Sequence, residues 1–248
     1  MNPEIHAESP PVICAISEYK GTKVTVLEDV YEPAEDTFLM ADCAVSAVLN
    51  SRAPDDLNDE YFVLEIGCGS GFVSAFLQNH FSSLRLTAVD INPAAVLCSR
   101  MNGVRSFESD MFDIFETAAS AAAADAAVAS AAAADAAAEE DIPQKPPFGF
   151  DFIFFNPPYL PTSDDEKVNG PLNYAFDGGV DGRGSINRFL TEVGAYLRSG
   201  GFFLLLISSI TGFSEVSAEM KKHGFSVEVA GTSKVSFEEL MVLKGKRI

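Results

Sequence analysis

The chain has 248 residues, of which 47% are hydrophobic, and its formal net charge is −19. This length and apolar content fit one domain with a single core. The strong negative charge disfavours binding to nucleic acid through its phosphates, which requires a basic face, and favours a basic protein surface as a partner. The longest apolar run, residues 201–207, is far shorter than the roughly 20 residues that a membrane span needs.

The cysteines and histidines form no pattern that predicts a disulfide framework or a metal site. Cys14, Cys43, Cys68 and Cys98 lie far apart without a CxxC pair, and the histidines share no ligand spacing with them. Residues 1–9 are polar and lack the features of a signal peptide. We therefore expect reduced thiols, no metal bound by this chain, and a cytoplasmic location, with the nucleus as a second compartment.

Short apolar segments alternate with helical stretches through most of the chain. Strands are predicted at residues 61–66, 85–91, 151–155 and 202–207, and helices at residues 73–80 and 93–101. The strand segments are apolar on both faces, which is typical of parallel strands covered by helices on both sides. This alternation predicts an open α/β sheet with right-handed crossovers.

Three other segments differ from this pattern. Residues 225–229 and 237–244 predict two antiparallel strands, separated by a break at residues 231–233, that close the sheet. Residues 118–141 are alanine-rich and of low complexity, and we predict a solvated helical insert without a functional role. Residues 1–29 are interpreted as an N-terminal extension of the single domain.

A glycine-rich loop follows the first predicted strand. It contains Glu65, Gly67, Gly69 and Gly71 in the order of a GxGxG motif preceded by an acid. Glycines allow a sharp turn from strand to helix and a close approach of the backbone to a ligand. A dinucleotide-binding loop would have glycine in place of Phe72, so the spacing favours S-adenosylmethionine over a nicotinamide cofactor.

Two further acidic positions are candidates for cofactor binding. Asp90, followed by Ile91 at the end of the second predicted strand, can accept hydrogen bonds from both ribose hydroxyls. As an alternative, Asp90 caps the helix that begins near Pro93. Asp110 can accept the adenine amino hydrogen, with Met111 contributing backbone or packing, although this pair carries weight only in combination with the other motifs.

The most specific motif is Asn156-Pro157-Pro158-Tyr159, which follows an apolar strand. The prolines fix the backbone and remove two N–H donors, so carbonyl groups face outward. The Asn156 side-chain oxygen and the Pro157 carbonyl can each accept one hydrogen of a planar NH2 group, and Tyr159 offers a stacking surface. Positioning of this kind supplies much of a rate enhancement without a general base.

Taken together, these motifs resemble those of class I methyltransferases that modify planar NH2 groups. Residues 31–37 are similar to a segment of the HemK-type glutamine methyltransferases, specifically the compact eukaryotic branch that acts on release factors. Residues 175–183 resemble the glycine-rich loop of that branch. The resemblance spans residues 30–244 in the same motif order, and it is interrupted by the alanine-rich insert.

The resemblance implies a Rossmann-like fold with a seven-stranded, mostly parallel sheet and a C-terminal antiparallel hairpin. It implies S-adenosylmethionine as the cofactor and the glutamine of the Gly-Gly-Gln motif in the class I translation termination factor as the substrate. A small zinc-binding activator protein that covers an apolar sheet edge would complete a heterodimer. By position, the cofactor-binding residues are Thr37, Glu65, Gly67, Gly69, Gly71, Asp90, Ile91, Asp110, Met111 and Asn156, and Asn156, Pro157, Pro158 and Tyr159 hold the glutamine.

Several alternatives remain open at this point. A DNA or RNA adenine methyltransferase uses the same tetrapeptide motif, but it normally carries a basic target-recognition surface. A ribosomal-protein glutamine methyltransferase would have a similar pocket. Histone lysine methylation requires loss of a proton from the ammonium group, which two acceptors do not obviously provide. An inactive binding subunit is disfavoured because Asp90 and Asn156 are both present.

Overall fold

The computed structural model describes residues 11–51, 60–116, 143–161 and 178–248. Its main element is a seven-stranded sheet with the strand order β5-β4-β3-β6-β7-β9-β8. The first five strands in this order are parallel, whereas β9 is antiparallel to both of its neighbours, as the sequence predicted. The strands are β3 (Tyr61–Ile66), β4 (Leu84–Asp90), β5 (Ser106–Glu108), β6 (Phe150–Phe155), β7 (Leu197–Ser208), β8 (Glu228–Lys234) and β9 (Glu239–Lys246).

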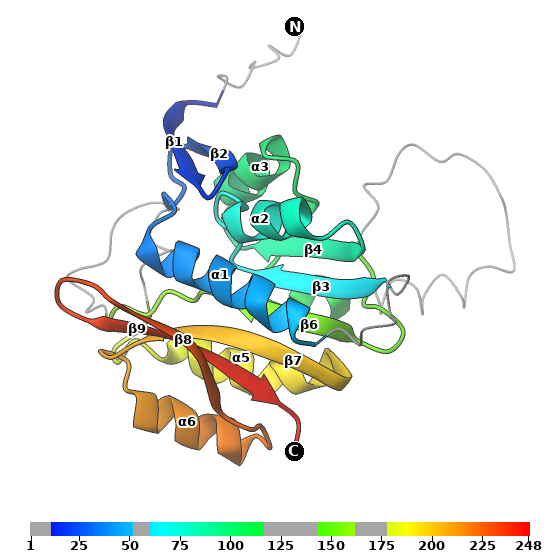
Figure 1. The fold of residues 1–248 in the computed structure, drawn as a ribbon, viewed down its shortest axis with the longest axis vertical. Helices are drawn as coiled ribbons and strands as arrows, with labels where there is room; N and C mark the ends of the chain where they lie inside the picture. The colour runs from blue at the N-terminus through cyan, green and yellow to red at the C-terminus, as the bar shows by residue number, and fades with distance from the viewer. Residues whose placement is uncertain (1–10, 52–59, 117–142, 162–177) are drawn as a thin grey trace, which may run out of the picture.

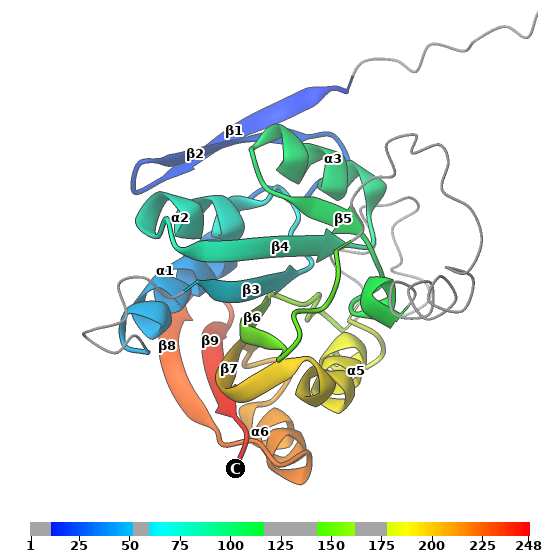
Figure 2. The same ribbon diagram turned by 90° about the vertical axis from the view of Figure 1, so that its right-hand side faces the viewer.

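Helices cover both faces of this sheet (Figures 1 and 2). Helices α1 (Glu35–Leu49) and α2 (Phe72–His80) pack on one face, and α5 (Gly184–Glu192) and α6 (Phe213–Lys222) pack on the other. Successive strand residues supply both cores: Val63 faces α1 and α2, whereas Leu64 faces the opposite layer. This alternation explains why the central strands are apolar at consecutive positions.

The N-terminal segment contains structure that the sequence did not predict. Strands β1 (Ile13–Tyr19) and β2 (Thr22–Leu27) form a separate antiparallel hairpin. The Asn102 amide, just after α3 (Pro93–Met101), accepts from Thr25 N at 2.9 Å and donates to Thr25 O at 2.7 Å. These hydrogen bonds attach the described part of the predicted extension, residues 11–29, to the domain.

The predicted break in the C-terminal hairpin is wrong. Gly231 lies within β8, at a shift in the register with β9, and the turn lies farther on, where Val235 N donates to Glu238 O at 3.0 Å. A Cβ atom at Gly231 would meet the Cys43 sulfur of α1 at 2.5 Å. Glycine is needed here because a helix passes close to the strand, and not because the chain turns.

Some predictions fall outside the described residues. These are the alanine-rich insert at residues 118–141 and the first part of the glycine-rich loop, residues 175–177. Among the helices of the described ranges, none has the length and apolar character needed to span a membrane. Those same ranges contain no group of three or more His, Cys, Asp or Glu side chains that could hold a metal ion.

Candidate active site

A cavity of about 510 Å³ opens at the carboxyl ends of the parallel strands. This is the expected place for a ligand in an open α/β sheet. Residues from six separate segments line it, and nearly all predicted site residues are among them. These are Thr37, Glu65, Gly67, Gly69, Asp90, Ile91, Asp110, Met111, Asn156, Pro157, Pro158 and Tyr159.

The glycine-rich loop brings its backbone to the wall of this cavity. Gly67 and Gly69 have φ angles of +65° and +53°, a region that favours glycine. Gly71 differs from them, because it is not part of the cavity lining. A Cβ atom there would meet Ser99 Cβ at 2.8 Å and Val104 Cγ2 at 3.0 Å. Gly71 therefore allows α2 to pack against α3, and its predicted contact with the cofactor stays a prediction.

Asp90 connects the end of β4 to the glycine-rich loop. Its buried carboxylate accepts hydrogen bonds from Gly69 N at 2.8 Å and Asn92 N at 2.9 Å. Burial raises the pKa of this carboxyl group, and the backbone hydrogen bonds oppose that shift. The cap of α3 is Asn92, which accepts from Ala94 N at 2.9 Å, so the alternative role for Asp90 as the cap is wrong. A carboxylate has about four acceptor sites, so Asp90 retains capacity for ribose hydroxyls.

Glu65 binds the first turn of α2 from the cavity wall. Its carboxylate accepts from Ser74 N at 3.1 Å and from the Ser74 hydroxyl. Burial raises the pKa of Glu65 to about 8, although the hydrogen bonds from Ser74 act in the opposite direction. The side chain therefore links cavity wall and helix, and its charge depends on pH near neutrality.

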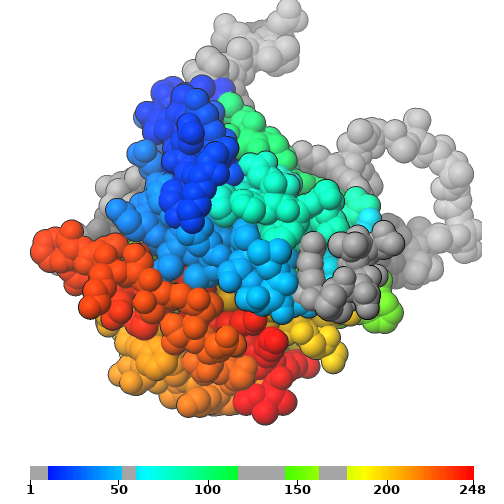
Figure 3. All heavy atoms as spheres, in the orientation of Figure 1, coloured from blue at the N-terminus to red at the C-terminus, as the bar shows by residue number. Residues whose placement is uncertain are grey.

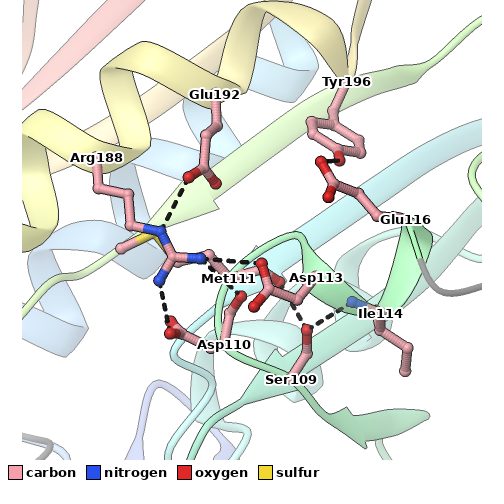
Figure 4. Close-up of polar contacts among 9 residues, drawn as sticks. All are labelled: Ser109, Asp110, Met111, Asp113, Ile114, Glu116, Arg188, Glu192 and Tyr196. Carbon is pink, nitrogen blue, oxygen red and sulfur yellow. Dashed lines mark hydrogen bonds and ion pairs between the residues drawn. The ribbon is translucent and has the colours of Figure 1, made fainter.

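Arg188 of α5 clamps the loop that holds Asp110 (Figure 4). Its guanidinium lies 2.6 Å from the Asp110 carboxylate, 2.9 Å from that of Asp113 and 2.9 Å from that of Glu192. Arg188 also lines the cavity. Arg188 was not predicted from the sequence, because it lies 78 positions from Asp110 and no local pattern relates the two.

The same loop is fixed from within by Ser109. Its hydroxyl donates to Met111 O at 3.1 Å and accepts from Ile114 N at 3.1 Å (Figure 4). Met111 has a φ of +52°, which is uncommon for a residue other than glycine and is maintained only where surrounding contacts impose it. Asp110 is thus presented to the cavity on a rigid turn.

Asn156 lies at the other end of the cavity, directly after β6. Its side-chain NH2 donates to Asp36 Oδ2 at 3.1 Å. Because only the nitrogen can donate, Asp36 determines which way the amide is turned. The carbonyl oxygen, Oδ1, is buried and has no hydrogen-bond partner within the described residues. A buried acceptor without a partner is costly, which indicates a site prepared for a donor.

Asp36 is the centre of a small network that the sequence analysis missed. It is buried in the first turn of α1 and also accepts from Thr37 N at 2.7 Å and the Tyr31 hydroxyl at 3.3 Å. Burial raises the pKa values of Tyr31 and Tyr159, so both phenols stay neutral in the physiological range. The signal was present in residues 31–37, from which only Thr37 was assigned to the site.

The turn at residues 178–184 supports the Asn-Pro-Pro-Tyr loop. Pro158 O accepts from the Ser185 hydroxyl at 3.3 Å. Gly182 has a φ of +70°, and a Cβ atom there would overlap the Tyr159 carbonyl oxygen. The described part of the predicted glycine-rich loop, residues 178–183, therefore packs against the backbone of the Asn-Pro-Pro-Tyr motif.

Comparison with known proteins identifies the family. The sequence profile of the Methyltransferase small domain family matches residues 42–116. A protein of Methanocaldococcus jannaschii, assigned by name to protein N5-glutamine methylation, is 38% identical over 94% of this chain and 100% of its own length. The chain belongs to the protein glutamine methyltransferase family. Human methyltransferase HEMK2 is 31% identical, over 87% of this chain and 89% of HEMK2.

Solved structures agree with this assignment at the level of the fold. The Mtq2–Trm112 complex of E. cuniculi, described as responsible for methylation of the eRF1 translation termination factor, aligns with a TM-score of 0.58 at 21% identity. The alignment covers 89% of this chain and 99% of that one. The 16S rRNA methyltransferase RsmC of T. Thermophilus, solved with AdoMet and guanosine, aligns with a TM-score of 0.57. The predicted class I methyltransferase fold is confirmed.

The family uses S-adenosylmethionine, and the cavity fits this cofactor. The fit rests on the Asp90 carboxylate beside the glycine-rich loop and on the Asp110 carboxylate held by Arg188. These groups suit a ribose and an adenine amino group, respectively. The methyl-bearing sulfonium would then lie between the adenosine end of the cavity and Asn156. The individual contacts of the predicted cofactor residues remain predictions.

Proposed function

We propose that this protein methylates the side-chain amide of a glutamine in the class I translation termination factor, within its Gly-Gly-Gln motif. The observation that supports this most is the Asn156 amide in the cavity lining, which Asp36 holds and whose buried oxygen has no hydrogen-bond partner among the described residues. A planar NH2 group is the natural donor for such an oxygen. The side-chain amide of glutamine has such a planar NH2 group next to a carbonyl, and it carries no charge.

The reaction depends on two acceptors that hold the amide nitrogen. Asn156 Oδ1 accepts one N–H of the substrate, and the Pro157 carbonyl accepts the other. The Pro158 carbonyl is already bonded to Ser185, whereas within the described residues no hydrogen bond to the Pro157 carbonyl is formed. With both hydrogens fixed, the nitrogen lone pair turns out of conjugation and points along the line of methyl transfer.

Bound S-adenosylmethionine supplies an electrophilic methyl group on a positively charged sulfur. Held by Asn156 and the Pro157 carbonyl, the substrate nitrogen would form the new N–C bond with its lone pair as the methyl–sulfur bond breaks, and the released N–H proton would leave to solvent with the product. Tyr159 and Tyr31 line the same cavity and would provide neutral aromatic walls beside the amide. Methyl transfer then requires orientation and exclusion of water more than a protein base.

We further propose that the protein works with a small activator protein. A Schizosaccharomyces pombe relative, 26% identical over 89% of this chain, is named as the catalytic subunit of an eRF1 methyltransferase, and the E. cuniculi relative was solved with Trm112. The apolar sheet edge suited to such a partner is β5. Beside β5, Leu97 of α3, which is 46% exposed, lines a surface groove together with Phe107 of β5, whereas the opposite edge strand β8 is mostly polar.

Zinc in the activator and a cytoplasmic location complete this proposal. Both follow from the resemblance to the release-factor branch, since a termination factor acts on ribosomes. Metal analysis of the purified heterodimer would test the first, because one zinc per complex is expected and the catalytic chain alone should contain none. Imaging of the tagged protein would test the second.

The decisive experiment is transfer of labelled methyl from S-adenosylmethionine to purified termination factor. The factor is supplied with its Gly-Gly-Gln glutamine intact or replaced, with and without the activator, and a DNA duplex is tested in parallel. Label on the intact factor alone supports the proposal, and dependence on the activator supports the heterodimer. Label on DNA, or equal label on the glutamine-replaced factor, would refute the proposed substrate.

A further inference from the structure

Exposed apolar side chains gather next to the Asn-Pro-Pro-Tyr loop, and the reaction described above does not use them. They come from the end of that loop, the turn at residues 178–184, the segment after β7, the start of α6 and the turn between β8 and β9. The five residues, here called the apolar rim, are Leu160, Val180, Ile210, Phe213 and Phe237, with exposures of 37%, 94%, 48%, 40% and 98%. Single exposed apolar residues are ordinary, but a gathered set marks an interaction site.

Hydrogen bonds join these segments to one another and to the active site. Leu160 itself lines the cavity, and Tyr159 lies close enough to the Glu238 carboxylate, next to Phe237 in sequence, that this group adds to burial in raising the pKa of the phenol. The remaining links are Gly178 N to Leu160 O at 3.1 Å, Arg183 Nη1 to Thr211 O at 2.8 Å, and Ser209 N to Glu239 O at 2.8 Å. The apolar rim is therefore continuous with the loop that holds the substrate amide.

The turn between β8 and β9 extends outward from the body of the molecule. Figure 1 shows it at the left-hand edge, and the space-filling view shows the same segment projecting beyond its neighbours (Figure 3). Phe237 lies in this turn, between the end of β8 and the start of β9, and is 98% exposed. An aromatic side chain held on a projecting turn is well placed to contact a large partner.

The length of a glutamine side chain requires a surface of this kind. Its amide nitrogen lies only about 5 Å from its Cα atom, given bond lengths of roughly 1.5 Å. When that nitrogen reaches Asn156, the substrate main chain and the flanking residues must lie at the mouth of the cavity. Exposed Glu32 and Glu35 flank the other side of the site, next to Tyr31 and Asp36 in the cavity lining.

We propose that the apolar rim docks the surface of the protein substrate that surrounds its glutamine. This inference rests on the proposed function and adds the chemistry of the contact: apolar side chains on the substrate meet the rim, and basic ones face Glu32 and Glu35. Docking of this kind lowers KM for the folded protein without acting on the transferred methyl group. A short Gly-Gly-Gln peptide lacks the surrounding surface and gains nothing from it.

The test is the double variant Phe237→Ser with Val180→Ser, assayed together with the activator. The matched control is Ile13→Ser with Ile16→Ser, because those side chains are 58% and 59% exposed on β1. We expect KM for the termination factor to rise by about 10-fold or more, as for interface hot spots. The kcat at saturation, the Kd for S-adenosylmethionine and the activity on the peptide should stay within about twofold, as they should in the control.

Three other outcomes would overturn the proposal that the apolar rim docks the protein substrate. A KM for the factor that stays within twofold of the unmodified protein overturns the proposal. Weaker binding of the activator with unchanged KM would assign the apolar rim to that partner, and this also overturns it. If the unmodified protein fails to label the factor at all, the proposed function is refuted, and the docking surface that rests on it falls as well.

Discussion

Replacing Asp36 with alanine should slow methyl transfer more than it weakens cofactor binding. Asp36 accepts from the Asn156 NH2 group at 3.1 Å, and this bond keeps the Asn156 oxygen directed toward the substrate. A hydrogen bond to a charged group contributes about 1.5–3 kcal/mol. At about 1.4 kcal/mol per factor of ten, its loss corresponds to a fall in kcat of about 10- to 100-fold.

The variant should also be less stable, for a separate reason. Asp36 accepts from Thr37 N at 2.7 Å in the first turn of α1, where Ala34 at the N-cap provides no side-chain bond. Loss of a capping interaction costs about 1 kcal/mol. Thermal unfolding with and without cofactor separates this effect from the effect on kcat, provided that kinetics are measured well below the transition.

Two further variants make the test of Asp36 specific. Asp36→Asn keeps an oxygen that can face Asn156, so its loss of kcat should be smaller than that of Asp36→Ala. Asp42→Ala is the control on the same helix, because Asp42 is outside the cavity lining and bonds Lys20 at 2.7 Å and the Tyr19 hydroxyl at 2.9 Å. If Asp36→Ala retained kcat within twofold and raised only KM for the cofactor, the orienting role would be refuted.

The remaining predictions concern both ends of the cavity and the insert. Asn156→Ala should abolish methyl transfer and leave the Kd for S-adenosylmethionine within a few fold; a large loss of cofactor binding in calorimetry would instead indicate a structural role. Arg188→Ala should raise that Kd by about 10-fold, because Asp110 loses a charge-assisted clamp, and an unchanged Kd would contradict this. Glu65 has a folded-state pKa of about 8, above its ordinary value of 4.5, so its protonation favours the folded state. Its contribution to stability is full below pH 4.5 and is lost as pH rises through 8. Denaturant unfolding of Glu65→Gln should therefore lack this part of the decline, and equal pH slopes would refute the assignment. Deleting residues 118–138 should leave activity largely intact, since that segment offers no chemistry, and an inactive deletion variant in the methylation assay would overturn this.

The central parallel strands, and the ends of those strands where functional loops begin, were predictable from the sequence, whereas the short edge strand β5 was not. Strand β3 and helix α3 coincide with the predicted segments, because apolar runs and residues such as Pro93 are local signals. The glycine-rich loop and the Asn156 motif were equally recognisable, since their chemistry depends on the backbone of consecutive residues. The order of these motifs was sufficient to predict the family.

The tertiary structure decided how the motif side chains are held. Asn156 is oriented by Asp36, 120 positions earlier, and Asp110 by Arg188, 78 positions later. The packing role of Gly71 likewise depends on which residues of α3 come to lie beside it. Hydrogen bonds and contacts between distant segments follow from the packing of whole elements. No local periodicity encodes these contacts, so the folded structure is needed to identify which side chain orients each motif residue.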